Sequence, residues 1–223
     1  MKKLILSASI LAFGIFNAQE ATETAAPKVT FSGYAEIFYT YDFNQRDDHI
    51  RQPFLYSYNR HNEFNLNLGL VKANYSTENM RANLALMAGT YAQDNLSAEQ
   101  DALKLINEAN VGFKISKTKN IWIDAGIMPS HIGWESAIGK DNMNLTRSLA
   151  AENSPYFETG AKISYTSDNG KLFLSGLVLN GWQRIARLEG NQTLAFGHQI
   201  TYKFSDDFSL NSSSFVGNDK PTE

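Results

Sequence analysis

Apolar residues recur at every second position in several stretches of the chain, which is the periodicity of β-strands. In residues 81–88, for example, Ala82, Leu84 and Leu86 alternate with Arg81 and Asn83. The pattern predicts nine strands, over 31–43, 64–70, 82–88, 109–115, 121–127, 159–165, 171–181, 194–204 and 207–217. The seventh is more uniformly apolar and indicates no clear facing, and the ninth is weak and rich in serine. In the second, alternation places Leu66, Leu68 and Leu70 on the face opposite Asn67.

The connections between these strands alternate strictly between short and long. The short ones, rich in the turn-forming residues Ser, Asn, Asp and Gly, are 76–79, 116–120, 167–170 and 205–207. The long ones are 44–60, 92–106, 129–156 and 182–192. Outer-membrane barrels have short periplasmic turns and longer outer loops, whereas a soluble sandwich has no reason to segregate its long loops. The sequence therefore predicts an all-β, antiparallel up-and-down transmembrane β-barrel.

The N-terminus has the form of a cleavable secretory signal peptide. Two lysines precede the apolar run 4–16, and Ala18 offers a small residue for cleavage. The run is shorter than the about 20 residues that a membrane-spanning helix needs. We expect a signal peptide at 1–18, a polar linker at 19–28 and barrel at 29–223, and localisation in the outer membrane.

Composition excludes several other classes of function. The mean hydropathy of -0.33 would suit a soluble protein, but alternating strands dilute their apolar residues with polar ones. The chain has no Cys. Its net charge is -3, and the sequence contains no basic patch that would indicate nucleic-acid binding. His49, His61, His131 and His198 lack metal-ligand spacing, and no nucleophile motif accompanies His131. We expect no metal, no cofactor and no enzymatic activity.

Three segments resemble a known family: PSHIGWES at 129–136, ENSPYFETG at 152–160 and LNGWQRI at 179–185. The opening FSGYAEIFYTYDFN, with HNEFNLNLGLVKANY after it, is similar as well. Together they resemble the β-barrel porin family of the OmpL-like group. The resemblance implies an outer-membrane barrel that passes small solutes, and it brings no catalytic residues.

The strand count indicates that this sequence is the N-terminal part of a longer family member. A bacterial single-chain barrel has an even number of strands and a closed edge, and the pattern here predicts nine. The chain also lacks a terminal amphipathic strand ending in an aromatic residue, the usual assembly signal of such barrels. We therefore expect an incomplete barrel of about nine strands.

The longest connection, 129–156, is a candidate constriction loop, because charges of both signs in a pore bias which solutes pass. Its charged residues are Glu135, Lys140, Asp141, Arg147 and Glu152. A solvated surface loop is the alternative. Strand parity also predicts lumen-facing charges of mixed sign, which favour at most weak ion selectivity. These are Glu36, Asp42, Arg81, Glu108, Lys114, Asp124, Glu158, Lys162 and Lys203.

Two local features complete the prediction. Residues 96–106 suggest a short helix with Ser97 as its N-cap, either in the lumen or in an outer loop. His198 falls on the lipid-facing side by parity, so either it lies near the membrane interface or the predicted register slips by one.

Three functions fit the pattern: a passive channel for small solutes, a non-conducting barrel acting as receptor, adhesin or structural anchor, and a soluble lipocalin-type barrel. The last requires an apolar interior, and the charges on the more polar face together with the alternating loops favour lipid outside. The expected partners are outer-membrane lipid and lipopolysaccharide, the barrel-assembly machinery and small solutes.

Overall fold

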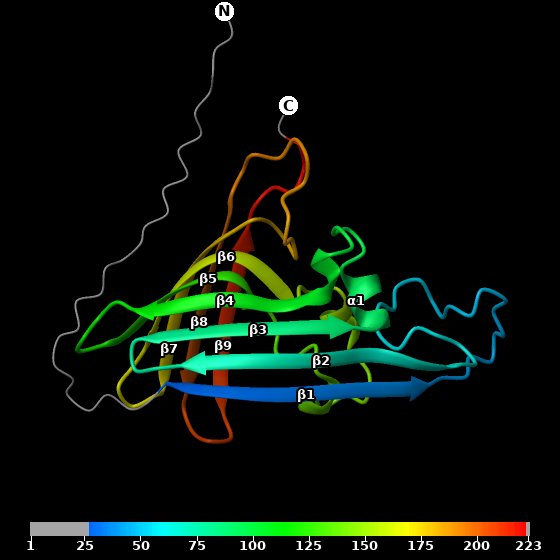
Figure 1. Ribbon diagram of the computed structural model, residues 1–223, viewed down its shortest axis with the longest axis horizontal. Coiled ribbons are helices and arrows are strands. Elements are labelled where there is room, and N and C mark those ends of the chain that lie inside the picture. The colour runs from blue at the N-terminus through cyan, green and yellow to red at the C-terminus, as the bar shows by residue number, and fades with distance from the viewer. Residues whose placement is uncertain (1–26, 222–223) are drawn as a thin grey trace, which may run out of the picture.

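The computed structural model describes residues 27–221 and contains one antiparallel sheet of nine strands in chain order (Figure 1). The strands are β1 (Lys28–Tyr39), β2 (Phe64–Ser76), β3 (Met80–Ala88), β4 (Ile106–Lys114), β5 (Asn120–Pro129), β6 (Phe157–Thr166), β7 (Leu172–Leu179), β8 (Ala195–Lys203) and β9 (Ser209–Val216). Each strand pairs with its neighbours in sequence, and the strictly alternating short and long connections are confirmed. The predicted up-and-down antiparallel sheet is therefore correct. The predicted signal peptide lies outside the described residues.

The sheet is curled but not closed (Figure 1). Within the described residues β1 pairs only with β2, and β9 only with β8. No helix among the residues described is long and apolar enough to cross a membrane. Two α-helices and two 3-10 helices lie in the long connections: α1 (Thr90–Asn95), η1 (Leu103–Leu105), η2 (Gly139–Asp141) and α2 (Leu149–Glu152).

The two faces of the sheet differ sharply in polarity. Residues 130–156 pack on one of them, called here the inner face. On the outer face, β1 to β8 carry apolar, aromatic or small side chains apart from Thr159 and His198. Large outer residues are solvent-exposed, such as Phe31 at 77% and Leu84 at 51%. Exposed apolar surface on this scale is expected where an apolar medium such as membrane lipid covers it.

Strand parity is confirmed for the charged residues of β3 to β6. Arg81, Asn83, Glu108, Asp124 and Lys162 share the inner face, because residues directly opposite one another in a sheet point to the same side. In β7, which had no predicted facing, inward Leu177 and Leu179 pack with Ala195 in a small apolar cluster. That cluster explains why the strand is apolar on both faces.

His198 lies on the outer face as parity predicts, so the register does not slip there. It is directly opposite Ser214 on β9, whose Oγ lies 2.6 Å from the imidazole Nδ1. This contact gives one polar atom of the imidazole a partner within the sheet.

The expected facing of the second strand is wrong beyond Asn67. A β-bulge lets Glu36 pair with Leu68 but Ile37 with Leu66, so Asn67 is the extra residue. Leu68 and Leu70 therefore turn to the inner face, where both are buried. The apolar alternation of Leu66, Leu68 and Leu70 continues through the bulge, so the sequence pattern gives no sign of it.

Strand β1 is displaced toward the N-terminus relative to its predicted span. It begins at Lys28, the last residue of the expected linker, and ends at Tyr39 rather than at residue 43. Asp42 therefore lies in the β1–β2 connection, where its carboxylate accepts a hydrogen bond from the Asn44 backbone N–H. Asp42 is not a wall residue of the sheet.

Of the helix expected over 96–106, only the 3-10 turn η1 is present. Helix α1 occupies residues 90–95 instead, and Ser97 caps nothing, because burial of Tyr91, Ala92 and Leu96 sets the position of the chain here. These residues pack with Leu68, Leu70, Met87, Tyr156 and Phe157 in the main apolar cluster. This core lies on the inner face at the end of the sheet that carries the long connections.

The chain has no cysteine, so the two faces can be distinguished with single cysteine variants. We expect Asn83→Cys, on the inner face, to react with a charged water-soluble thiol reagent when the protein is in lipid vesicles. Leu84→Cys, the next residue on the outer face, should stay unlabelled until detergent is added. Equal labelling of both cysteines would contradict the assignment of the faces.

Candidate functional site

Two ion pairs cross the inner face between strands that are not adjacent. Lys72 on β2 donates to Glu108 on β4 at 2.7 Å. Arg81 on β3 donates through Nε and Nη2 to the two carboxylate oxygens of Asp124 on β5, both at 2.6 Å. Such bidentate pairs fix geometry as well as charge. The inner face therefore carries a wall of paired charges.

Gly112 makes the Arg81–Asp124 pair possible. It lies between the two residues on β4, and a Cβ placed there would come within 2.1 Å of Asp124 Oδ1. Arg81 also lies over the Trp122 ring, with its guanidinium carbon 4.4 Å from the ring centroid. The guanidinium thus bridges an aromatic ring and a carboxylate that is only 3% exposed.

A row of three asparagines runs across the neighbouring inner positions. Asn74 donates to Asn83, Asn83 donates to Asn110, and Asn110 donates to the Ile127 carbonyl, at 3.0, 2.8 and 2.8 Å. Each of the three side-chain amides therefore donates a hydrogen bond to the next group in the row. The row extends the polar surface beside the ion pairs without adding charge.

Residues 130–156 fold over the inner face and contact strands near both edges of the sheet. Toward β9, the Ser213 hydroxyl donates to the His131 carbonyl at 2.8 Å. Toward β1, the Lys140 backbone N–H donates to the Tyr34 hydroxyl at 3.4 Å. This one connection thus contacts both edge strands of the curled sheet, β1 and β9.

His131 anchors this connection through a buried pair with Glu158 on β6. Its Nδ1 lies 2.5 Å from Glu158 Oε2, and its Nε2 lies 2.8 Å from the Ser214 carbonyl on β9. Burial opposes protonation of the imidazole, but the hydrogen bonds to Glu158 and Ser214 outweigh it and raise the pKa of His131. Gly197 on β8 leaves the space that Nε2 occupies, since a Cβ there would lie 2.6 Å away.

A second anchor is built from tyrosines around Glu36. The Tyr34 and Tyr58 hydroxyls donate to Oε1 at 2.8 and 2.5 Å, and the Asn67 amide donates to Oε2 at 2.7 Å. Asn67 is the bulge residue, so the bulge brings its amide to this carboxylate. Gly139 of η2 packs directly against Glu36 and Tyr58.

Arg147 holds the far part of the connection. It is 6% exposed, donates through Nη2 to the Ala137 carbonyl, and lies against the Tyr58 and Tyr156 rings at 5.8 and 5.7 Å. Its Nε and Nη1 have no hydrogen-bond partner within the described part of the chain. A guanidinium this buried serves the packing of the connection rather than direct contact with solvent.

The remaining charged residues of the connection differ in exposure. Glu152 is buried and accepts from the Tyr56 N–H at 2.7 Å, and burial raises the pKa of its carboxyl against the effect of that hydrogen bond. Burial also acts on Glu135, but hydrogen bonds from Ser148 and Asn144 outweigh it and lower the pKa of that carboxyl. Lys140 and Asp141 are exposed.

The strand residues predicted to face the lumen fall into two groups. Glu36, Arg81, Glu108, Asp124, Glu158 and Lys162 all lie on the inner face. Of these, Glu36, Glu108 and Glu158 lie beside residues 130–156. Lys114 and Lys203 lie instead near the short-turn ends of β4 and β8, where Lys203 pairs with Asp206 at 2.8 Å.

Sequence reasoning missed Lys72 and the anchoring role of His131. Lys72 has inner parity once the bulge is known, but the predicted second strand ended before it. The sequence pattern around His131 addresses only metal binding and catalysis, and it indicates neither. Neither contact could be inferred from the sequence, because 36 residues separate Lys72 from Glu108 and 27 separate His131 from Glu158.

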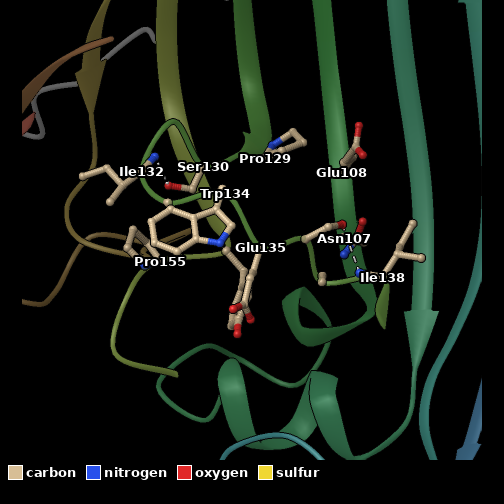
Figure 2. A pocket seen from close by; sticks show the side chains of 13 residues that line it. Asn107, Glu108, Pro129, Ser130, Ile132, Trp134, Glu135, Ile138 and Pro155 are labelled. Atoms are coloured by element: carbon tan, nitrogen blue, oxygen red, sulfur yellow. Dashed lines mark hydrogen bonds between the residues drawn. The ribbon is translucent and has the colours of Figure 1, made fainter. Parts of the chain in front are cut away.

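A cavity of about 250 Å³ lies between the connection and the start of β4. Figure 2 shows its lining residues coming from Pro129 to Ile138, from Asn107 and Glu108, and from Pro155. Trp134 lines it although its side chain is largely exposed, at 87%. Glu108 lines this cavity and also a second cavity on the ion-paired wall.

Comparison with known families identifies the architecture. The family described as "Putative beta-barrel porin-2, OmpL-like" matches residues 28–223. The chain belongs to this family. Neither the curated proteins nor the solved structures include a significant match. Membership gives the β-barrel porin a porin-type role in the outer membrane, in agreement with its apolar outer face.

Proposed function

We propose that this β-barrel porin is a channel for passive diffusion of small solutes across the outer membrane. The observation that carries the proposal is the contrast between its faces: an inner face of ion pairs and amides opposite an outer face of exposed apolar side chains. In lipid, polar groups must be satisfied within the protein or by water. An aqueous path along the inner face meets that requirement.

Residues 129–156 act in this proposal as the constriction. They cross the inner face and bring Glu135, Lys140 and Asp141 toward solvent while Arg147 and Glu152 are buried beneath. The mixed signs on the connection and the wall give weak ion selectivity, because opposed charges bias transit without excluding either sign. The partners are small solutes, the outer-membrane lipid with its lipopolysaccharide, and the barrel-assembly machinery. No cofactor and no catalysis enter this function.

Deletion of 137–150 is expected to speed solute efflux from protein-containing vesicles. The deletion removes η2 and Arg147 while leaving His131 and the ion pairs of the wall in place. Efflux of small neutral sugars of increasing size measures the effect, and larger sugars should gain most. Unchanged rates for all sizes, with the variant inserted to the same extent as the unmodified protein, would remove the constriction from the account.

A non-conducting barrel that serves as receptor, adhesin or anchor is the second candidate. The observation in its favour is the attachment of residues 130–156 near both edges of the sheet, which would suit a plug as well as a constriction. Vesicles that retain every small sugar although the protein is folded and inserted would favour this second function.

A further inference from the structure

Lys162 is a cation of the inner face that forms no ion pair within the part of the chain that the structure describes. It lies on β6 directly opposite Asp124 on β5, but both oxygens of Asp124 are taken by Arg81. Among the described residues, the Lys162 ammonium has no hydrogen bond and no ion pair at contact distance, whereas Lys72 and Arg81 both do. An ammonium that is half-buried and unpaired is costly unless water or a ligand completes it.

The Lys162 side chain lines a cavity of about 340 Å³ on the inner wall. The ionisable residues of its lining are Lys72, Arg81, Lys162, Glu108 and Asp124, three cations and two carboxylates. The lining therefore carries one net positive charge, which resides on Lys162. Trp122 and Phe173 add apolar surface beside it, and Ser164 adds a hydroxyl.

We propose that this cavity binds small monocarboxylates, with the solute carboxylate on the Lys162 ammonium and its organic part against Trp122 and Phe173. One anionic charge neutralises the lining, whereas a dianion reverses its sign and a neutral solute leaves the ammonium unpaired. Asp124, Glu108 and Glu158 attract the Lys162 ammonium electrostatically, but Asp124 and Glu108 are hydrogen-bonded by Arg81 and Lys72. The Lys162 ammonium therefore keeps its hydrogen-bond donors for the entering carboxylate.

The role of this cavity in transport rests on the proposed function, because the cavity can select among solutes only if solutes pass through the barrel. Binding itself is measurable without transport. The chain has three tryptophans, and replacing Trp134 and Trp182 by phenylalanine leaves Trp122, in the cavity lining, as the sole fluorophore. The probe is sodium propionate, and propionamide is its neutral isostere.

In the refolded protein in detergent, propionate should change Trp122 fluorescence in a saturable manner and propionamide should not. Lys162→Gln should weaken the apparent affinity for propionate roughly tenfold, because it removes a charge-assisted hydrogen bond. Lys162→Arg should retain binding. Lys114→Gln, on the inner face but outside this lining, is the matched control and should bind as the unmodified protein does.

Equal responses to propionate and propionamide would overturn the site, and so would a Lys162→Gln variant with unchanged affinity. Planar-bilayer conductance of the same preparation separates this inference from the proposed function. Conducting protein without propionate binding refutes the site alone. Saturable binding by non-conducting protein supports the site while refuting the channel.

Discussion

Replacing Arg81 by methionine is expected to lower the free energy of unfolding by about 2–4 kcal/mol, because it leaves the buried Asp124 carboxylate without its bidentate partner. The lower part of that range reflects the partial exposure of Arg81, whose side chain is 38% accessible against 5% for Asp124. Urea unfolding of the refolded protein in vesicles measures the loss. The Trp122 ring also loses the guanidinium packed over it.

Two controls isolate the cause. The double variant R81M/D124L removes both charges and should recover most of the lost stability, since an apolar pair can replace a buried ion pair at little cost. Arg46→Met breaks a pair of the same 2.6 Å length between Arg46 and Asp48, both well exposed, and should change stability little. Equal losses for R81M and R46M would show that burial of Asp124 is not the reason.

Release of residues 130–156 from β6 is expected as the pH rises. Hydrogen bonds to Glu158 and Ser214 raise the pKa of His131 above its ordinary value of about 6.5. A raised folded-state pKa means that the stabilising contribution is complete below the ordinary value and is lost as the pH rises through the raised one. Weakening of the anchor should therefore appear at neutral to alkaline pH.

Trypsin cleavage after Arg147 reports this release, because Arg147 is 6% exposed while the connection is docked. Between pH 7 and pH 9 the rate of that cut should rise roughly tenfold as a charge-assisted hydrogen bond is lost. His131→Gln keeps a polar side chain without a titrating group, and it should give a rate that does not vary with pH beyond the change in trypsin itself. A pH-dependent rise of the same size in H131Q would refute the anchor.

The sheet was predictable because its signals are local. Alternation placed Arg81, Asp124 and Lys162 on one face, and serine-rich turns fixed the alternating connections. The failures are also physical. The bulge at Asn67 inverts the facing of Leu68 and Leu70 without breaking the apolar alternation, and tertiary burial of Tyr91 and Leu96 overrides the capping signal of Ser97.

The site was predictable only as a set of residues. Parity identified which charges share a face, but pairing depends on geometry across strands. Gly112 provides the space in which Arg81 reaches Asp124, two strands away. Nothing local in the sequence indicates that His131 would reach Glu158. The expectation that the chain is part of a longer barrel stays a prediction.

Single-channel recording in planar lipid bilayers measures whether the inner face lines an aqueous path. The measurement uses the purified protein, refolded and shown by its β-sheet circular dichroism to be folded. Stable, ohmic current steps with weak selectivity between cations and anions are the predicted result. Folded protein that inserts into the bilayer and passes no current would contradict the claim and favour a non-conducting receptor, adhesin or anchor.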